Sequence, residues 1–374
     1  MASCIIFSLL FFLPFAIAPF GVTQFESPKV ILAEAGILLL FLVYLFQNTL
    51  SFHNRKTRLV LFTSIFLLTC IHLIFFRTDL SFFGNAFRMQ GIFLLWMLLL
   101  FSFLSSQISF KRVPWWIYYL LLCIELLWLF YLPQNASHRY VGTLGEPNAL
   151  AGFAIFLWPF GWFGLKNSKW EIGGKIMVLI LVSIILYVSG SRSGMIAIGI
   201  ELVFIFLSQS KKVFSLSLKT CVAICLSLYV ASYAFPFFEH VQYENRAEVW
   251  QSALYAGMIN PGLGQGFGNT EIALHNAAAG IDLPIQYYYV DSSHNIFLDW
   301  WVESGVIGLS ILLIIVYLTF AAFIKQNKKR ELVLLLGMLT VLSFNPASIV
   351  GLLGFWWIIG QGLYDKNNSY VPSG

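Results

Sequence analysis

The stretch ESGVIGLSILLIIVYLTFAAFI, at residues 303–324, decides the fold class of this chain. After its first residue, 21 residues pass without a charged side chain, and about 20 apolar residues in a helix are enough to cross the hydrocarbon core of a bilayer. The whole 374-residue sequence has the same character, with 59% hydrophobic residues, 10% charged residues and a mean hydropathy of +0.80. Because an average soluble domain carries about 25% charged residues, the composition excludes a water-soluble globule and indicates a polytopic membrane protein.

Eleven further apolar runs accompany this stretch. They lie near residues 3–20, 29–47, 58–76, 91–108, 113–132, 148–165, 174–189, 193–208, 213–235, 331–345 and 349–364. Runs of this length and composition are typical of membrane-spanning helices. The sequence therefore predicts an all-α fold, a polytopic transmembrane helical bundle of about 12 helices.

The basic residues indicate an orientation, because Lys and Arg are retained on the cytoplasmic side of membrane proteins. Sixteen of the 22 basic residues fall in alternate loops and in the tail, at Arg55, Lys56, Arg58, Lys111, Arg112, Lys166, Lys169, Lys175, Lys211, Lys212, Lys219, Lys325, Lys328, Lys329, Arg330 and Lys366. Both termini are therefore predicted to be cytoplasmic. We divide the chain into nine transmembrane helices at 1–235, a larger extracytoplasmic loop with short helices at 236–302, and three helices with a cytoplasmic tail at 303–374.

Several function classes are excluded by composition and motifs. The net charge of +5 is spread thinly along an apolar chain, which argues against nucleic-acid binding. The five cysteines lie in apolar runs, without a CxxC pair or a His/Cys spacing that would hold zinc. The HExxH, GxSxG and kinase signatures are also missing from the sequence. We therefore expect chemistry that needs neither a metal nor a cofactor.

Six basic residues remain on the predicted outer face: Lys29, Arg77, Arg88, Arg139, Arg192 and Arg246. Lys29, Arg88 and Arg192 lie at the starts of helices that run from outside to inside. The N-terminal end of a helix is positive, so a cation there is unfavourable by a few tenths to about 1 kcal/mol unless an anion is also present. The arrangement therefore predicts an anion on this face.

Arg192 and Arg246 are the strongest candidates for binding that anion. Arg192 lies in a link of a few residues between two apolar runs; the alternative is an interfacial anchor whose side chain reaches the membrane surface. Arg246 begins the segment RAEVWQSAL and is the one basic residue between Lys219 and Lys325. A helix N-terminus together with an Arg is a typical phosphate site. The alternative for Arg246 is a structural ion pair with one of the acids nearby.

His294 is the candidate general base. Ser292 or Ser293 can cap a helix with His294 in its first turn, where the helix dipole favours a neutral ring that can accept a proton. Asp291 or Glu303 could orient the ring, and spacing does not decide between them. The alternative is a histidine with a purely structural role. The run PGLGQGFG, at residues 261–268, indicates a tight backbone turn, and the close approach of a ligand there stays an alternative.

Several blocks, in this order, resemble the O-antigen ligase and O-antigen polymerase family of bacterial membrane proteins. They are SGSRSG at 189–194, NRAEVWQSAL at 245–254, PGLGQGFG at 261–268 and SSHNIFLDWWVESGVIG at 292–308. FGNAFRMQG at 83–91 and VGTLGEPNALAGF at 141–153 are similar to the family's more N-terminal blocks. The resemblance spans most of the chain and is strongest from Val141 to Gly308.

The resemblance implies a metal-independent glycosyltransferase of the bacterial cytoplasmic (inner) membrane with its active site on the outer face. Its donor would be a glycan linked to undecaprenyl diphosphate. Its acceptor would be a hydroxyl on lipid A-core or a similar lipid in the ligases, or on another lipid-linked glycan in the polymerases. The matched positions imply that His294 is the base and that Arg192 and Arg246 hold the diphosphate. Possible supporting residues are Arg88, Asn148, Asp291, Asn295 and Glu303.

Two other functions remain open at this stage. A polymerase of the same family would use the same chemistry but make ladders of repeats on the lipid carrier. A transporter or flippase for a lipid-linked glycan would use the Arg residues only to bind and release phosphate. The sequence carries no internal repeat, which is the usual pointer to a secondary transporter.

Overall fold

The computed structural model describes residues 1–18, 22–47, 56–107, 113–129, 131, 134, 138–166, 168–208, 246–281 and 290–363. Within these ranges every regular element is a helix, and the β structure is limited to an isolated bridge between Gln134 and Tyr140. The all-α prediction is therefore confirmed for the described part of the chain. The run predicted at 213–235 and the first residues of the insertion lie outside the described residues.

The first eight predicted runs each coincide with helical structure. The N-terminal element is made of α1 (Ala2–Phe7), η1 (Ser8–Phe12) and η2 (Leu13–Phe15), and it is followed by α2 (Glu26–Phe46), α3 (Lys56–Phe75), α4 (Ile92–Ser105), α5 (Trp115–Trp128), η3 (Gly142–Leu144), α6 (Pro147–Gly164), α7 (Glu171–Ser189) and α8 (Arg192–Leu207). After the undescribed segment come α11 (Arg246–Ile259), α12 (Thr270–Gly280), α13 (Ile296–Lys325), α14 (Lys329–Leu342) and α15 (Ile349–Leu363).

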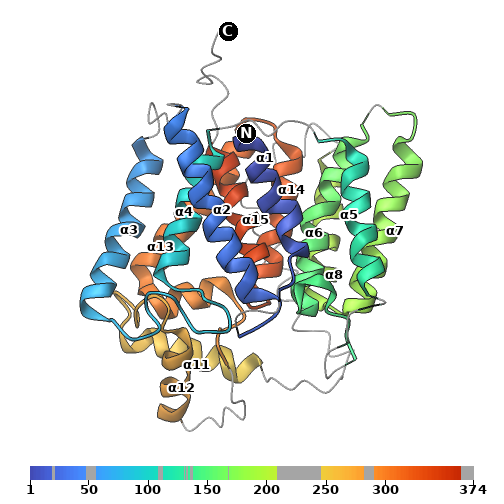
Figure 1. Ribbon diagram of the computed structural model, residues 1–374. Coiled ribbons are helices and arrows are strands. Elements are labelled where there is room, and N and C mark those ends of the chain that lie inside the picture. Colours follow the sequence, from blue (N-terminus) through green and yellow to red (C-terminus); the bar gives the residue numbers. More distant parts are fainter. Residues whose placement is uncertain are drawn as a thin grey trace.

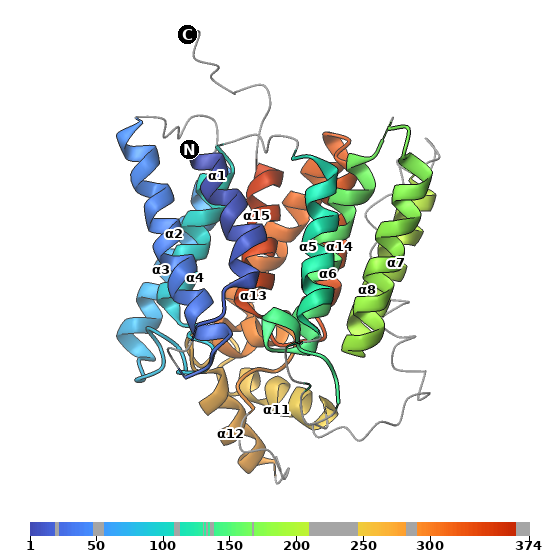
Figure 2. The same ribbon diagram turned by 45° about the vertical axis from the view of Figure 1, so that its right-hand side comes forward.

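The long helices stand side by side, and α11 and α12 lie together at one end of them (Figures 1 and 2). Hydrogen bonds identify what else lies at that end. The Gln90 side chain before α4 donates to the carbonyl of Ala347 before α15, over 2.5 Å, and the backbone NH of Ile349 donates to the Glu26 carboxylate, over 2.6 Å. We call this end, which holds α11, α12 and the starts of α2, α4, α6, α8, α13 and α15, the loop end.

The opposite end holds the N-terminus, as Figure 1 shows, and the end of α15. There the Lys328 ammonium donates to the carbonyl of Gln361 over 3.1 Å, and the Gln361 side chain donates to the carbonyl of Ser105 over 2.9 Å. Basic residues of the predicted cytoplasmic loops lie at this end: Lys166 follows the last turn of α6, and Lys325 is the last residue of α13. The described helices therefore separate the two predicted sets of charges onto opposite ends of the bundle.

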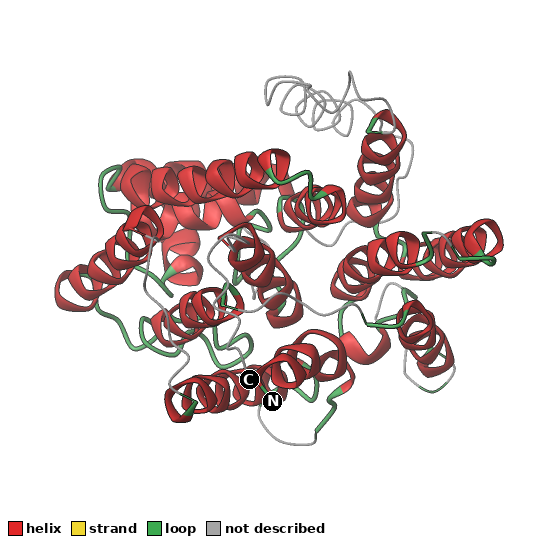
Figure 3. Ribbon diagram, turned by 90° about the horizontal axis from the view of Figure 1, so that it is seen from above, coloured by secondary structure: helices red, strands yellow, loops and turns green. Residues whose placement is uncertain are grey.

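The sides of the bundle are apolar. Three helices, α2, α7 and α13, are long and apolar enough to cross a membrane. They also expose large apolar side chains sideways, among them Leu39, Ile180 and Ile314. In contrast, α15 is buried along its length and occupies the interior of the bundle. Seen along the axis, the described residues form helices and connecting loops without any strand (Figure 3). Such exposed apolar sides are typical of helices that face lipid.

Helix α13 begins earlier than the apolar run that predicts it. It starts at Ile296 and is interrupted at Gly305, which has φ 59° and ψ −159°. The expected cap at Ser292 or Ser293 is wrong: Asn295 is the N-cap, and its side chain accepts from the backbone NH groups of Phe297 and Leu298. The serines instead bind Asp299, one turn inside the helix. His294 therefore precedes the helix rather than lying in its first turn.

The glycine-rich turn at 261–268 packs backbone to backbone against the break in α13. The NH of Gln265 donates to the carbonyl of Val302 over 2.7 Å, and the NH of Val306 donates to that of Pro261 over 2.8 Å. A Cβ on Gly264, at φ +73°, would lie 2.5 Å from the backbone of Glu303 and Ser304. The predicted tight turn is thus confirmed, and the segment against which it packs closely is α13.

We expect Gly264→Ala to destabilise the protein, because a left-handed backbone alone costs an L-residue about 1–2 kcal/mol and the added Cβ overlaps with α13. Gly262→Ala, two residues earlier, is the matched control, since its Cβ would meet no atom within 4 Å. Thermal unfolding followed by intrinsic fluorescence should show a lower midpoint for Gly264→Ala and nearly the parental midpoint for Gly262→Ala. Equal midpoints for the two variants would contradict the packing described here.

Candidate active site

The sequence-predicted residues Arg192, Arg246 and His294 all lie at the loop end. Arg192 is the first residue of α8, and its exposed side chain follows Ser191, whose hydroxyl caps the helix by accepting from the NH of Gly194 over 3.3 Å. Arg246 is the first residue of α11 and is half-buried. The next turn of α11 buries Trp250, whose indole NH donates to the carbonyl of Ser293 over 2.9 Å. That bond ties the start of α11 to the segment that carries His294.

His294 has an unusual backbone and is nearly buried. Its φ is +60° and its exposed fraction is 8%, and its backbone NH donates to the Ser292 hydroxyl over 3.0 Å. A residue other than glycine held in this region costs of order 1–3 kcal/mol, and such residues cluster at functional sites. The conformation results from the hydrogen bonds around it, because Asp299 holds the two preceding serines and Asn295 caps the helix that follows.

The surroundings of His294 keep its ring neutral. Burial lowers the pKa of the imidazole to about 3, and the positive charges of Arg246 and Arg88 contribute to the shift. The neutral ring that the sequence predicted from a helix dipole therefore has a different cause, namely desolvation and two guanidinium groups. A neutral imidazole can accept a proton near pH 7.

Arg139 is a residue that sequence reasoning did not select. Its guanidinium donates to the carbonyl of Ser189 over 2.6 Å and to the Asn148 side chain over 2.9 Å. Burial lowers the pKa of Arg139, and the charges of Arg246 and Arg192 lower it further, whereas Glu146 opposes them. Arg139 thus shares one electrostatic environment with both predicted phosphate-binding residues. The signals available in the sequence were its place among the six outward cations and its position two residues before the VGTLGEPN block.

Three guanidinium groups therefore gather at the loop end, on the starts of α8 and α11 and on the loop before α6. We call Arg139, Arg192 and Arg246 the arginine cluster. Like charges this close repel one another, and the starts of two helices add positive ends of helix dipoles at the same place. The arrangement is suited to an anion with several negative oxygens, which is the kind of ligand that guanidinium groups bind in bidentate fashion.

The possible supporting residues have hydrogen-bond or ion-pair partners within the protein, and Arg88 is the first example. Arg88 forms ion pairs with Asp291, at 2.5 Å, and Glu146, at 3.6 Å. Although burial alone would lower the pKa of Arg88, the carboxylates of Glu146, Asp291 and Glu26 raise it above its ordinary value. Its charge is balanced by protein groups, so the expectation that a cation here requires an external anion is wrong for Arg88.

The same holds for Lys29, which is fully buried. Its ammonium donates to the carbonyls of Phe25, at 3.0 Å, and Thr143, at 2.8 Å, and it interacts with the charges of Glu26 and Glu125. The cation at the start of α2 is thus one member of a cluster of charged groups inside the protein. This cluster fixes the loop that leads to Asn148.

Neither candidate for orienting His294 makes a hydrogen bond to it among the described residues. Asp291 binds Arg88. Glu303 accepts from the backbone NH of Gly268, at 3.0 Å, and the hydroxyl of Thr270, at 2.9 Å, and so holds the glycine-rich turn. Asn295 is a helix cap, and Asn148 acts on the site through Arg139.

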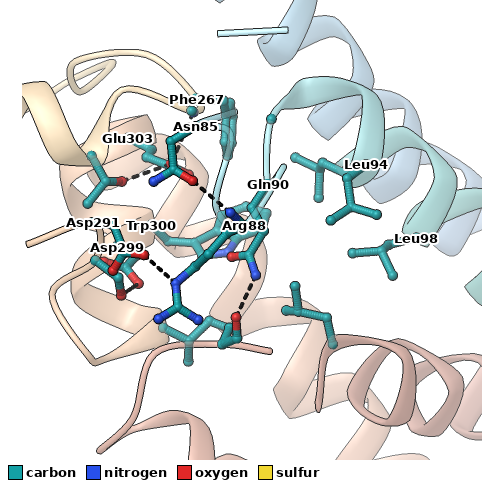
Figure 4. Close-up of a pocket in the computed structure, with 18 of the residues that line it drawn as sticks. Asn85, Arg88, Gln90, Leu94, Leu98, Phe267, Asp291, Asp299, Trp300 and Glu303 are labelled. Atoms are coloured by element: carbon teal, nitrogen blue, oxygen red, sulfur yellow. Dashed lines mark hydrogen bonds and ion pairs between the residues drawn. The ribbon is translucent and has the colours of Figure 1, made fainter. Parts of the chain in front are cut away.

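A cavity of about 110 Å³ opens beside this group, between α4, α13, α15 and the start of α12 (Figure 4). Arg88 extends into it and is held there by Asp291. Ser292 and Ile296 line the same cavity, and His294 lies between them in the sequence without being a lining residue itself. The arginine cluster does not line it. In the described part of the chain, no set of three His, Cys, Asp or Glu side chains is arranged to hold a metal ion.

The fold and the charged loop end define this protein as a helical membrane protein with a polar site at one end of its bundle. Residues 177–313 match the family model described as O-Antigen ligase. The match covers most of α7, all of α8, α11 and α12 and the first part of α13, and so includes Arg192, Arg246 and His294. The chain carries an O-antigen ligase domain, and the family indicated by the sequence motifs is confirmed. A comparison with curated proteins found no match.

Proposed function

We propose that this protein is a membrane glycosyltransferase that moves a glycan from undecaprenyl diphosphate to the hydroxyl of a lipid or glycan acceptor, as an O-antigen ligase does. The reaction takes place at the loop end, on the outer face of the bacterial inner membrane. The observation that carries the proposal is that Arg246, which shares its electrostatic environment with Arg139, also acts on the buried, neutral His294. Such a transfer requires a group of cations that can bind a diphosphate, next to a group that can accept a proton.

Each residue has a defined role in this mechanism. The acceptor hydroxyl attacks the anomeric carbon of the donor glycan, and its proton passes to the imidazole of His294. The bond between the anomeric carbon and the diphosphate oxygen breaks, and the diphosphate leaves with the electron pair. Direct displacement inverts the configuration at the anomeric carbon.

The arginine cluster stabilises the leaving group. Negative charge accumulates on the diphosphate as the bond breaks, and guanidinium groups that the protein already holds in place stabilise that charge without the reorganisation that water would need. Arg192 and Arg246 donate from two helix starts, and Arg139 is held in place by Asn148 and Ser189. The mutual repulsion of the three cations decreases when the diphosphate binds.

Product analysis tests the proposal. Purified protein should transfer a glycan from a defined undecaprenyl diphosphate donor to an added acceptor, and the rate should be unchanged after dialysis against EDTA. One transfer per acceptor identifies a ligase, whereas ladders of repeats on the carrier identify a polymerase. In detergent no compartments exist, so a new glycosidic product excludes transport as the main activity. The enzyme assignment is wrong if the protein makes no product in detergent but, when reconstituted in proteoliposomes, moves the donor across their membrane.

The rate should be nearly insensitive to pH on the acid side. A base works in its neutral form, above its pKa, and the pKa of His294 is lowered to about 3. An ordinary histidine, with a pKa of about 6.5, would be mostly protonated at pH 5 and would lose over 90% of the rate. We therefore expect kcat/KM, which reports the free enzyme, to stay within about twofold between pH 5.5 and 8. A fall centred near pH 6.5 would contradict the assigned environment.

A further inference from the structure

The cavity beside Arg88 has two kinds of wall. Its apolar wall is formed by side chains of α4, α13 and α15, namely Leu94, Leu95, Leu98, Ile296, Trp300, Leu352 and Trp356. Its polar wall, toward the loop end, carries Asn85, Glu271, Asp291, Asp299 and Glu303. A pocket with an apolar depth and a polar mouth fits an amphipathic ligand.

The charges on the polar wall limit what that ligand can be. Among the lining residues, all of which are described, Arg88 is the one cation, and it is already paired with Asp291 and Glu146. The other titratable lining groups are carboxyl groups, so no lining group is left to balance a phosphate. An anion placed here would lie beside the carboxyl groups of Glu271 and Asp291 with no further cation in the lining to balance it, which is unfavourable.

Hydroxyl groups, in contrast, can be bound. Glu271 accepts from the Asn85 side chain through Oε2 alone, and Glu303 accepts its two hydrogen bonds through Oε1 alone. The second oxygen of each carboxyl group can therefore accept from a ligand hydroxyl. Trp300 and Phe267 line the same cavity, and aromatic rings offer flat apolar surface for the CH face of a sugar.

We propose that this cavity is the acceptor site and that it selects an uncharged, hydroxyl-bearing sugar on an apolar anchor. The inference rests on the proposed function. The position of His294 supports it, because the imidazole precedes Ile296 of the cavity wall and senses the charge of Arg246 in the arginine cluster. In this arrangement the diphosphate binds at the arginine cluster and the sugar hydroxyl reaches the base from the cavity. Arg88, held by Asp291 and Glu146, lines the cavity and also contributes to the electrostatic environment of His294.

Photolabelling tests the site without requiring turnover. The probe is n-octyl β-D-glucoside with a diazirine in the alkyl chain, added to the full-length protein in lipid nanodiscs free of glycoside detergent. Labelled peptides are mapped by mass spectrometry. We expect labels on peptides that contain residues 91–98 or 296–300, and at least about tenfold less labelling by the 6-phosphate of the same probe, because nothing in the lining balances the added charge.

Leu95→Trp should fill the cavity and remove the labelling. Leu100→Trp, on the same helix and equally half-buried but not among the lining residues, is the matched control and should keep it. Equal labelling by the two probes, or labelling that survives Leu95→Trp, would overturn the inference. Failure of the proposed function has a different signature: the cavity labels as expected, yet no glycosidic product forms from the diphosphate donor.

Discussion

Replacing His294 with Asn is expected to lower the transfer rate at least ~100-fold, the usual scale for losing a general base. Asn is the informative replacement because it tolerates a positive φ better than most residues, and His294 has a φ of +60°. It therefore keeps the backbone of the loop and removes the proton acceptor. His294→Ala would remove the base as well, but the strained backbone would add a stability cost of about 1–2 kcal/mol.

The measurement is single-turnover transfer of a labelled glycan, with donor affinity determined separately. The variant should bind the undecaprenyl diphosphate donor as the parent does, because the arginine cluster is intact. His275→Asn is the matched control: it removes a histidine of α12 that lies at the same end of the bundle and has no place in the mechanism. Parental turnover by His294→Asn would remove the general-base mechanism, and an equal loss in both variants would indicate damage to the fold.

Replacing Arg246 with Gln should lower kcat about 10²–10³-fold, the scale for removing one group that stabilises developing negative charge. Arg246→Lys should recover only part of the rate, because an ammonium keeps the charge but lacks the planar, bidentate fork. The control is Arg77→Gln, which removes an exposed cation from the loop end outside the arginine cluster and should leave kcat within about twofold. The kcat of all three variants is obtained from initial rates at saturating donor.

Two further readouts separate a ligand-binding Arg246 from a structural one. If Arg246 acts on the ligand, its replacement should leave the midpoint of thermal unfolding close to the parental value, whereas loss of a structural contact would lower it. The pKa of His294 should also move upward, since one of the charges that lower it is gone while burial, the largest cause, remains; an NMR titration of the ring measures the change. A variant that is inactive because it unfolds at a lower temperature would contradict the role assigned to Arg246.

The helices were predictable because their signal is local. A long apolar run can satisfy its backbone groups in a membrane only as a helix, and eleven of the twelve predicted runs coincide with described helices. The helix starts were less predictable. Ile296 begins α13 ahead of its apolar run because Asn295 caps it, and Asp299 takes the two serines that would otherwise have served as caps. The choice between neighbouring caps depends on contacts that spacing does not contain.

The residues of the candidate site, like the helices, could be predicted from the sequence only in part. Arg192, Arg246 and His294 could be selected because charged groups and histidines at helix ends are conspicuous in an apolar sequence. Arg139 could not be ranked above Arg77, since both are outward cations in loops. Only the bonds from Arg139 to Asn148 and Ser189 distinguish them. Lys29 and Arg88 were the opposite case, since each was expected to need an external anion. Arg88 is paired with Glu146 and Asp291 from distant parts of the chain, and Lys29 interacts with Glu26 one turn earlier and with Glu125 of α5.

The sequence by itself determined the helical class, the division of charge between the two ends of the bundle, and the family to which its motifs belong. These properties depend on composition and on the period of single segments. The tertiary structure alone decided that Arg88 is paired with Asp291 and Glu146 and that Arg139 shares one electrostatic environment with Arg192 and Arg246. It also decided the cause of the neutral His294 and the placement of a cavity next to it. The physical reason is that Coulomb interactions and desolvation depend on distance and burial in space, and residues more than a hundred positions apart become neighbours only when the bundle packs.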